Sequence, residues 1–285
     1  MPVEPPIETP RSLGEAYALL SALPRTPIAG GTDLMVRITG EIGSPPDQVL
    51  DLSRLAELRG VAVLDGHLSL GALTTYTEMR RSPVVAERLP VLAEVAATIG
   101  AAQIQNRGTL GGNIANASPA GDTLPLLLAL DARIVVGGAR GERAVPADQF
   151  WVAYRTTALA PDELVLRVEV PLVADRQVRF RKVGTRRAQA ISKVVMALAW
   201  EQPEPRGAWT NVRLALGSVA DRPVRARATE LILEGSRATL EVADAAAETV
   251  ASEIRPIDDV RSTADYRRTV TARILHRLIR DAGGW

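Results

Sequence analysis

Apolar residues in the N-terminal half of the chain recur in short runs, some with the period of a strand and some with the period of a helix. A short helix is predicted after Ser12, because its spacing to Glu15 is that of a capping box. A second helix is predicted over 90–99, with Gly100 as its end. The mixture of short strands and short helices predicts an α+β fold for this half.

The C-terminal half has a different pattern, and the change falls near 170–177, where a strand-like run ends in proline and polar residues. Three strand-like runs follow, at 179–183, 193–200 and 209–220. Three helical patterns close the chain, at 225–234, 239–254 and 265–280. The last of these has one apolar face, made by Val270, Ile274, Leu275, Leu278 and Ile279. Strands followed by helices predict a second domain built on an antiparallel meander.

Two glycine-rich segments interrupt the pattern of the first half, "PIAGGTDL" at 27–34 and "TLGGNIANASPAGD" at 109–122. Glycine permits a positive φ and lets a ligand approach the main chain, and converging backbone N–H groups bind anions. Two such turns suit a phosphate or pyrophosphate ligand. Neither segment has the glycine spacing of a Rossmann fold or the lysine of a phosphate loop. Tight turns and helix caps remain the alternative for each residue singly, with Asp122 as a possible N-cap.

Composition narrows the chemistry further. The chain has 34 basic and 33 acidic residues, a net charge of +1, so nothing favours nucleic acid or an anionic membrane as a partner. It has no cysteine, which excludes disulfides, thiolate nucleophiles and cysteine-ligated iron–sulfur clusters on this chain. No signal sequence or long apolar run is visible, and we expect a cytoplasmic protein without a transmembrane segment.

Candidate catalytic groups are few. His67 and His276 are the only histidines, and we interpret both as surface or packing residues. A basic cluster contains Lys182, Arg186, Arg187 and Lys193. Such a run is usually a solvated face, but Lys182 is the candidate for a charge that points at an anionic ligand.

Four stretches in order along the chain resemble one known family: 27–34, 103–132, 180–194 and 258–275, the last reading "DDVRSTADYRRTVTARIL". They are similar to the FAD-binding (medium) subunit of the molybdenum hydroxylases, the group of xanthine dehydrogenase and aerobic carbon monoxide dehydrogenase. The resemblance implies an α+β fold with a two-subdomain FAD-binding domain of the vanillyl-alcohol-oxidase (PCMH) type. A C-terminal domain of the carbon monoxide dehydrogenase flavoprotein type would follow, with a three-stranded antiparallel sheet and helices. The implied boundaries are 1–173, with subdomains at about 1–54 and 55–173, and 176–285.

The resemblance also implies which residues contact FAD. The two glycine segments would hold its pyrophosphate from two sides, Asp122 matches a family aspartate that contacts the cofactor, and Lys182 matches a basic residue near the flavin. Ile99 stands where some eukaryotic relatives have a phenylalanine over the isoalloxazine ring. The resemblance also implies a contact between FAD and the backbone of Val165 or Leu164. The expected set is Ile28, Ala29, Gly30, Gly31, Thr32, Asp33, Leu34, Ile99, Thr109, Leu110, Gly111, Gly112, Asn113, Ser118, Asp122, Val165 and Lys182, with no catalytic residue and no metal ligand.

By the same resemblance, the chain would be one subunit of a heterotrimeric oxidoreductase that is itself dimerised. Electrons would come from a molybdenum-cofactor large subunit through iron–sulfur clusters on a small subunit, and FAD would pass them to NAD, oxygen or a quinone. The basic cluster and the final helix are candidates for the subunit interface. Two other functions stay open: a flavin-free assembly subunit of the same fold, and a self-contained FAD-dependent reductase.

Overall fold

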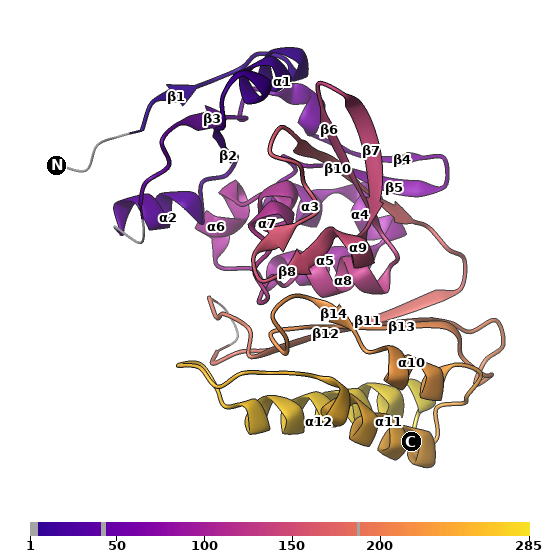
Figure 1. Ribbon diagram of the computed structural model, residues 1–285. Helices are drawn as coiled ribbons and strands as arrows, with labels where there is room; N and C mark the ends of the chain where they lie inside the picture. The colour runs from indigo at the N-terminus through magenta and orange to yellow at the C-terminus, as the bar shows by residue number, and fades with distance from the viewer. Residues whose placement is uncertain (1–4, 41–43, 187–188) are drawn as a thin grey trace. The chain divides into compact units, whose positions relative to one another are not determined.

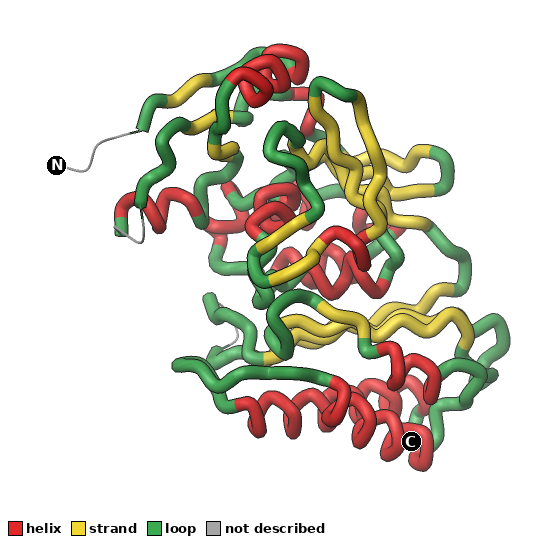
Figure 2. The backbone as a smooth tube through the Cα atoms, viewed as in Figure 1, coloured by secondary structure: helices red, strands yellow, loops and turns green. Residues whose placement is uncertain are grey.

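The computed structural model describes residues 5–40, 44–186 and 189–285, and its elements are shown in Figures 1 and 2. Contacts between residues group the chain into two compact units that do not follow chain order. The first unit holds residues 1–116, 133–150 and 157–170, and the second holds 117–132, 151–156 and 171–285. Residues 117–132, a loop followed by one short helix, therefore belong with the C-terminal part of the chain.

The first unit contains two sheets. The smaller one is parallel, in the order β1-β3-β2, and consists of β1 (Ile7–Glu8), β2 (Thr26–Ile28) and β3 (Val49–Asp51). The larger one has the order β4-β5-β10-β6-β7 and consists of β4 (Val61–Leu64), β5 (His67–Gly71), β6 (Arg133–Gly138), β7 (Gly141–Pro146) and β10 (Leu164–Pro171). β6 and β7 form a hairpin with a glycine-rich turn between them.

Short helices join these strands, and α1, α3 and α4 each begin after a serine or threonine whose side chain caps them. Ser12 accepts a hydrogen bond from the Glu15 amide at the start of α1, as the sequence predicts. The helices of this unit are α1 (Leu13–Ala22), α2 (Leu34–Thr39), the 3₁₀ turn η1 (Ala56–Leu58), α3 (Tyr76–Arg81), α4 (Pro83–Arg88), α5 (Pro90–Ala97), α6 (Ala102–Arg107), α7 (Leu110–Asn116) and α9 (Ala147–Phe150). A two-stranded ribbon, β8 (Trp151–Ala153) with β9 (Thr156–Thr157), follows α9.

The second unit is built on the predicted meander. Its antiparallel strands are β11 (Arg176–Val183), β12 (Val194–Glu201), β13 (Thr210–Gly217) and the two-residue β14 (Val224–Arg225). Helix α8 (Leu124–Ala129) packs against β12 and β13. Three further helices, α10 (Arg227–Leu233), α11 (Leu240–Glu253) and α12 (Ala264–Gly283), cover the other face in Figure 1 and share a core with it. All residues of β12 from 194 to 200 are buried, because helices lie on both faces.

The α+β class and the sheet-and-helix layout of the C-terminal part are confirmed, with β14 as a fourth strand that the sequence did not indicate. Two local predictions are wrong. Residues 110–113 belong to helix α7 rather than to a turn, and Ile99 lies beyond the end of α5. Across the described residues, no helix has the length and apolar character that crossing a membrane requires.

Candidate functional site

The first glycine segment is a turn, as predicted. It runs from the end of β2 at Ile28 to the start of α2 at Leu34. Gly31 has φ of +75°, in the left-handed region that favours glycine. Gly30 is needed for a different reason: a Cβ there would overlap the carbonyl oxygen of Arg107. The turn is therefore held tightly against the chain that leads into the second glycine segment.

The backbone N–H groups of this turn are its main chemical feature. The hydrogen bonds of the described part of the chain include none donated by the amides of Ala29, Gly30, Gly31, Thr32 or Leu34. The turn does use its carbonyls, since the Met35 amide donates to Gly31 O at 2.9 Å and the Leu52 amide donates to Ile28 O at 2.9 Å. Each of these five residues is only half-buried. A cluster of unpaired donors beside a positive-φ glycine is the arrangement that binds an anion.

Apolar contacts fix the base of this turn. Ala29 packs against a buried cluster that includes Leu52 and Leu164. Leu164 and Val165, the two candidates for a backbone contact, are buried at the start of β10 and pair with Gly137 and Val136 of β6. The predicted residues Ala29 and Leu164 thus lie in the same core of the first unit.

The second glycine segment has a different structure. Thr109 accepts a hydrogen bond on its hydroxyl from the Gly112 amide at 3.2 Å and begins helix α7. The other amides of the segment are also engaged: Leu110 donates to Thr74 O at 3.0 Å, Gly111 donates to Ala72 O at 2.8 Å, and Asn113 donates to Thr109 O at 3.1 Å. These four donors are used within the chain.

The two glycines of α7 differ from each other. A Cβ on Gly111 would lie 2.7 Å from Ala72 Cβ and 2.8 Å from Ala72 O, so Gly111 permits close packing of the helix on the chain after β5. Gly112 is exposed, and a Cβ there would meet only the Thr109 hydroxyl within 4 Å. Gly112 is therefore the point of this segment where a ligand can approach the main chain.

A second group of predicted residues meets in the other unit. Asp122 Oδ2 accepts a hydrogen bond from Lys182 Nζ at 2.5 Å, and both side chains are about nine-tenths buried. Ser118 lies in the same loop as Asp122 and accepts a bond from the Ala120 amide on its hydroxyl at 3.3 Å. Thr123, not Asp122, occupies the N-cap position of α8, so the capping role considered for Asp122 is not realised.

Only one of the two oxygens of the Asp122 carboxylate accepts a hydrogen bond from the described residues. Its Oδ1 is buried and has no hydrogen-bond partner among the described residues. Burial raises the pKa of Asp122 above its ordinary value, and the Lys182 ammonium opposes this increase. The Ser192 hydroxyl also lowers the pKa of Asp122, and it donates to Ala120 O at 3.2 Å and lies 3.0 Å from the Ser218 hydroxyl. A buried carboxylate oxygen without a donor is suited to a ligand that brings one.

The remaining candidates lie elsewhere. Ile99 is half-buried in the turn after α5, where its carbonyl accepts a bond from Gln105 Nε2 at 3.0 Å. His67 contacts Asp65 O, and His276 lies 3.2 Å from Asp244. Arg186 is exposed and donates to Gln189 O, whereas Arg187 lies outside the described residues. Within the described ranges, no group of three or more His, Cys, Asp or Glu residues could hold a metal ion.

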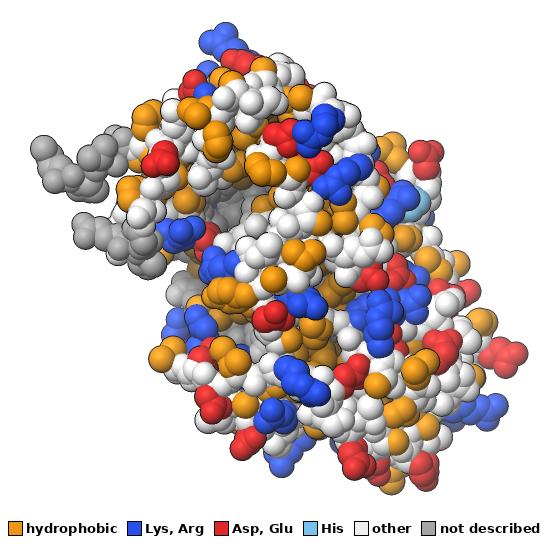
Figure 3. Space-filling view, in the orientation of Figure 1, with side chains coloured by type: hydrophobic (Ala, Val, Ile, Leu, Met, Phe, Trp, Pro, Cys, Tyr) orange, Lys and Arg blue, Asp and Glu red, His pale blue; other side chains and the backbone are white. Residues whose placement is uncertain are grey.

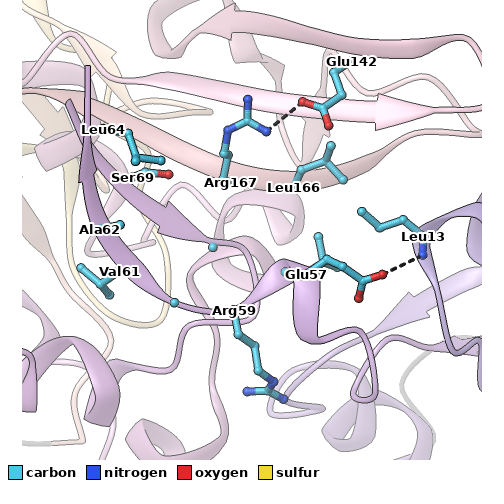
Figure 4. A pocket seen from close by; sticks show the side chains of 13 residues that line it. Leu13, Glu57, Arg59, Val61, Ala62, Leu64, Ser69, Glu142, Leu166 and Arg167 are labelled. Atoms are coloured by element: carbon cyan, nitrogen blue, oxygen red, sulfur yellow. Dashed lines mark hydrogen bonds and ion pairs between the residues drawn. The ribbon is translucent and has the colours of Figure 1, made fainter. Parts of the chain in front are cut away.

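The first unit also has a cavity of about 420 Å³ that contains none of the predicted residues (Figure 4). Arg167 and Glu142 form an ion pair at 2.8 Å at its wall, and Glu57 accepts a bond from the Leu13 amide at 3.4 Å. On the face shown in Figure 3, basic and acidic side chains are interspersed. This matches the balanced composition, and on that face neither sign of charge dominates.

Sequence reasoning missed one part of the site, the buried hydroxyls of Ser192 and Ser218 beside the Asp122 loop. Ser192 lies within the third stretch that carried the family resemblance, and that was the only available signal. Hydrophobic periodicity could not indicate these serines, because their hydrogen bonds join three separate parts of the chain, around Ala120, Ser192 and Ser218.

Comparison with known proteins gives the family. Residues 3–173 match the FAD binding domain in molybdopterin dehydrogenase, and residues 179–282 match the CO dehydrogenase flavoprotein C-terminal domain. The glyceraldehyde dehydrogenase medium chain of Sulfolobus acidocaldarius is 35% identical over 261 residues, 91% of each chain. The carbon monoxide dehydrogenase medium chain of Hydrogenophaga pseudoflava is 33% identical, over 96% of this chain and 95% of that one.

Solved structures agree with this assignment. A chain of carbon monoxide dehydrogenase from Hydrogenophaga pseudoflava superimposes with a TM-score of 0.92 at 32% identity, covering 97% of this chain and 96% of that chain. A chain of quinoline 2-oxidoreductase from Pseudomonas putida 86 gives a TM-score of 0.91 at 28% identity, covering 99% and 98%. This chain therefore belongs to the FAD-binding subunits of the molybdenum hydroxylase family of oxidoreductases, and its cofactor is FAD.

Proposed function

We propose that this chain is an electron-transfer subunit that holds FAD chiefly through the backbone of its first glycine turn. The observation that carries the proposal is the set of five amides, at residues 29–32 and 34, that donate to no acceptor among the described residues. A pyrophosphate presents several acceptor oxygens, and such amides can bind them without a cation. Bound FAD would supply the electron-transfer chemistry, and the chain would hold and orient it.

The other residues of the expected set have narrower roles in this proposal. Ile28 and Ala29 fix the turn from β2, and Thr32 and Asp33 add polar groups beside its amides. The start of α7 is formed by Thr109, Leu110, Gly111 and Asn113. Gly112 would let FAD come close to the main chain. Ile99 and Val165 would make apolar or backbone contacts. Their support is the resemblance together with their places in the first unit.

Asp122 and Lys182 would act on the same cofactor through charge and hydrogen bonding. The residues present fit such a role, because Asp122 Oδ1 is a buried acceptor that lacks a donor and FAD carries hydroxyl and N–H donors. Lys182 already bonds Oδ2 at 2.5 Å, so it holds the carboxylate in place instead of presenting a free cation. Ser118 would complete the loop that carries Asp122.

The partners in this proposal are a molybdenum-cofactor subunit and an iron–sulfur subunit, in a heterotrimer that itself dimerises. Relatives named medium chain or medium subunit support this arrangement. The absence of cysteine also supports it, since iron–sulfur clusters would need to be held by another chain. The terminal acceptor, the cytoplasmic location and the domain boundary at 173–176 stay predictions.

The test is titration of the purified chain with FAD, followed by flavin absorbance and fluorescence. Binding of about one FAD per chain, lost in a variant of the first turn, is the expected result. An assembly subunit without flavin would co-purify with its partners yet bind no FAD. A self-contained reductase would oxidise a nicotinamide donor with a carbon substrate in the absence of other subunits.

A further inference from the structure

The loop that carries Asp122 is connected to the rest of the second unit by two buried serines. Ser192 contacts Ala120 O through its hydroxyl at 3.2 Å, two residues before Asp122. The Ser192 and Ser218 hydroxyls lie 3.0 Å apart, and Ser218 Oγ donates to Ser192 O at 3.0 Å. Both serines are at most 4% exposed. The position of the Asp122 loop therefore depends on the position of Ser218.

Ser218 has a backbone conformation that its side chain disfavours. It follows the last residue of β13 with φ of +65°, in the left-handed region. Its amide donates to Pro119 O at 2.8 Å, so the strained residue contacts the Asp122 loop a second time. A non-glycine residue persists in such a conformation only when its surroundings fix it, and this type of strain clusters at functional sites.

Arg267 of α12 supplies that constraint. Its Nη1 donates to the Ser218 carbonyl at 2.6 Å, and its Nη2 donates to Asp259 Oδ1 at 2.7 Å. The residue is 4% exposed, and its Nε has no hydrogen-bond partner among the described residues. A buried arginine with one unsatisfied nitrogen adds little to stability, so holding a geometry is the better explanation for it.

Asp259 in turn is fixed by the chain around it. Its Oδ1 also accepts bonds from the Arg261 amide at 2.9 Å and the Ser262 amide at 3.0 Å. These residues lie in "DDVRSTADYRR", a motif that the flavin contacts expected from the sequence leave without a role. The motif and the Asp122 loop are thus the two ends of one chain of contacts.

We propose that Arg267 is a positioning residue for FAD binding, which acts through Ser218 and Ser192 to hold the Asp122 loop. The inference rests on the proposed contact of Asp122 with FAD. Arg267 itself touches neither the loop nor, in this proposal, the cofactor. Its guanidinium fixes the Ser218 carbonyl. The amide of Ser218 then bonds Pro119 O and its hydroxyl contacts Ser192, and these contacts hold the Asp122 loop in place.

The experiment is a double-mutant cycle on the full chain, with the FAD dissociation constant measured by flavin fluorescence. The variants are Arg267→Met, Asp122→Asn and the pair, and apoprotein melting is followed in parallel. If Arg267 acts through Asp122, Arg267→Met raises the dissociation constant about tenfold with Asp122 present and less than about twofold in the Asp122→Asn background. Arg268→Met is the matched control, because Arg268 is the neighbouring exposed arginine paired with exposed Asp265.

A milder variant keeps the test decisive if Arg267→Met folds poorly. Ser192→Ala removes the hydroxyl that contacts Ala120 O and should raise the dissociation constant about threefold, again only with Asp122 present. Equal fold-changes in both backgrounds would mean a purely structural role and would overturn the inference while leaving FAD binding by Asp122 intact. If Asp122→Asn alone leaves the affinity unchanged, the contact of Asp122 with FAD and the inference both fail, whereas binding by the first turn is unaffected.

Discussion

The two glycine segments of the first unit have similar sequences and opposite structures. In the first, at 28–34, the glycines open a turn in which the amides of 29–32 and 34 donate to no acceptor among the described residues. In the second, at 109–113, the amides of residues 110–113 are used by α7 and by the chain after β5. Gly111 there serves packing, since a Cβ would lie 2.7 Å from Ala72 Cβ.

This difference shows that glycine-rich sequence alone does not identify an anion site. What matters is where the N–H groups of the segment are used. The first segment offers the amides of 29–32 and 34, whereas the amides of 110–113 in the second are already used within the described chain.

The largest effect is expected for Gly30→Val. Its side chain would overlap the backbone of Arg107, and the backbone cannot move aside cheaply. We expect a loss of about 3 kcal/mol or more in the free energy of unfolding, together with loss of FAD binding. Urea unfolding measures the free energy of unfolding, and titration with FAD measures binding. Normal stability with normal FAD affinity would contradict the packing of the first turn.

Gly111→Ala should affect stability more than binding. The new methyl group meets Ala72, and overpacking of this kind costs about 1–3 kcal/mol, partly offset by the better helix propensity of alanine. The amides of the first turn are unchanged, so the FAD affinity of the folded protein should fall less than about threefold by this reasoning. A loss of affinity with unchanged stability would assign Gly111 to the binding site itself.

The pH dependence of FAD binding should come from Asp122 and not from the first turn, because backbone amides do not titrate. Burial raises the pKa of Asp122 in the folded chain above its unfolded value of about 4. Between the unfolded pKa and the raised folded pKa of Asp122, the folded apoprotein therefore binds more protons than the unfolded chain. Its free energy of unfolding falls as the pH rises through this window. A donor from FAD on Oδ1 favours the charged form, so FAD affinity should rise about fivefold across the same window. The slope should vanish in Asp122→Asn; an unchanged slope in that variant would place the titrating group elsewhere.

The smallest effect is expected for Gly112→Ala. The added methyl group would lie 2.9 Å from the Thr109 hydroxyl, which must shift slightly, and the better helix propensity of alanine offsets part of this cost, so stability should change by less than about 1 kcal/mol. If FAD approaches the main chain at Gly112, its dissociation constant should rise about threefold. Gly60→Ala is not a suitable control because of its positive φ, but Gly14→Ala is, since Gly14 is also in a helix and a Cβ there would meet only the Ser12 hydroxyl, at 3.9 Å.

Much of the fold follows from the sequence. The meander and α12 could be predicted because their apolar residues recur with a clear period, and Leu275, Leu278 and Ile279 are buried as expected. Helix α7 could not, because two adjacent glycines disfavour a helix and only the packing against Ala72 overrides that preference. α2 is the reverse case: it is apolar, yet none of its residues is buried.

The candidate site was predictable only in part. The sequence indicates the first turn, because tolerance of a positive φ is a local property of glycine, but it does not show that the amides of the turn are unused. The ion pair of Asp122 with Lys182 joins residues 60 positions apart, and the contact of Arg267 with Ser218 joins residues 49 apart. Local patterns carry no information about such pairings, so only the family resemblance indicated Asp122, and for Arg267 it indicated a motif without a role.

The most direct test of the account is the amide spectrum of the chain labelled with ¹⁵N-glycine, recorded with and without FAD. The 22 glycines give few enough signals to assign Gly30, Gly31 and Gly111 by substitution. We predict large downfield shifts of the Gly30 and Gly31 protons, as expected for new bonds to phosphate, while Gly111 stays unshifted because its amide is bonded to Ala72 O. Shifts confined to α7, with Gly30 and Gly31 unchanged, would contradict the account.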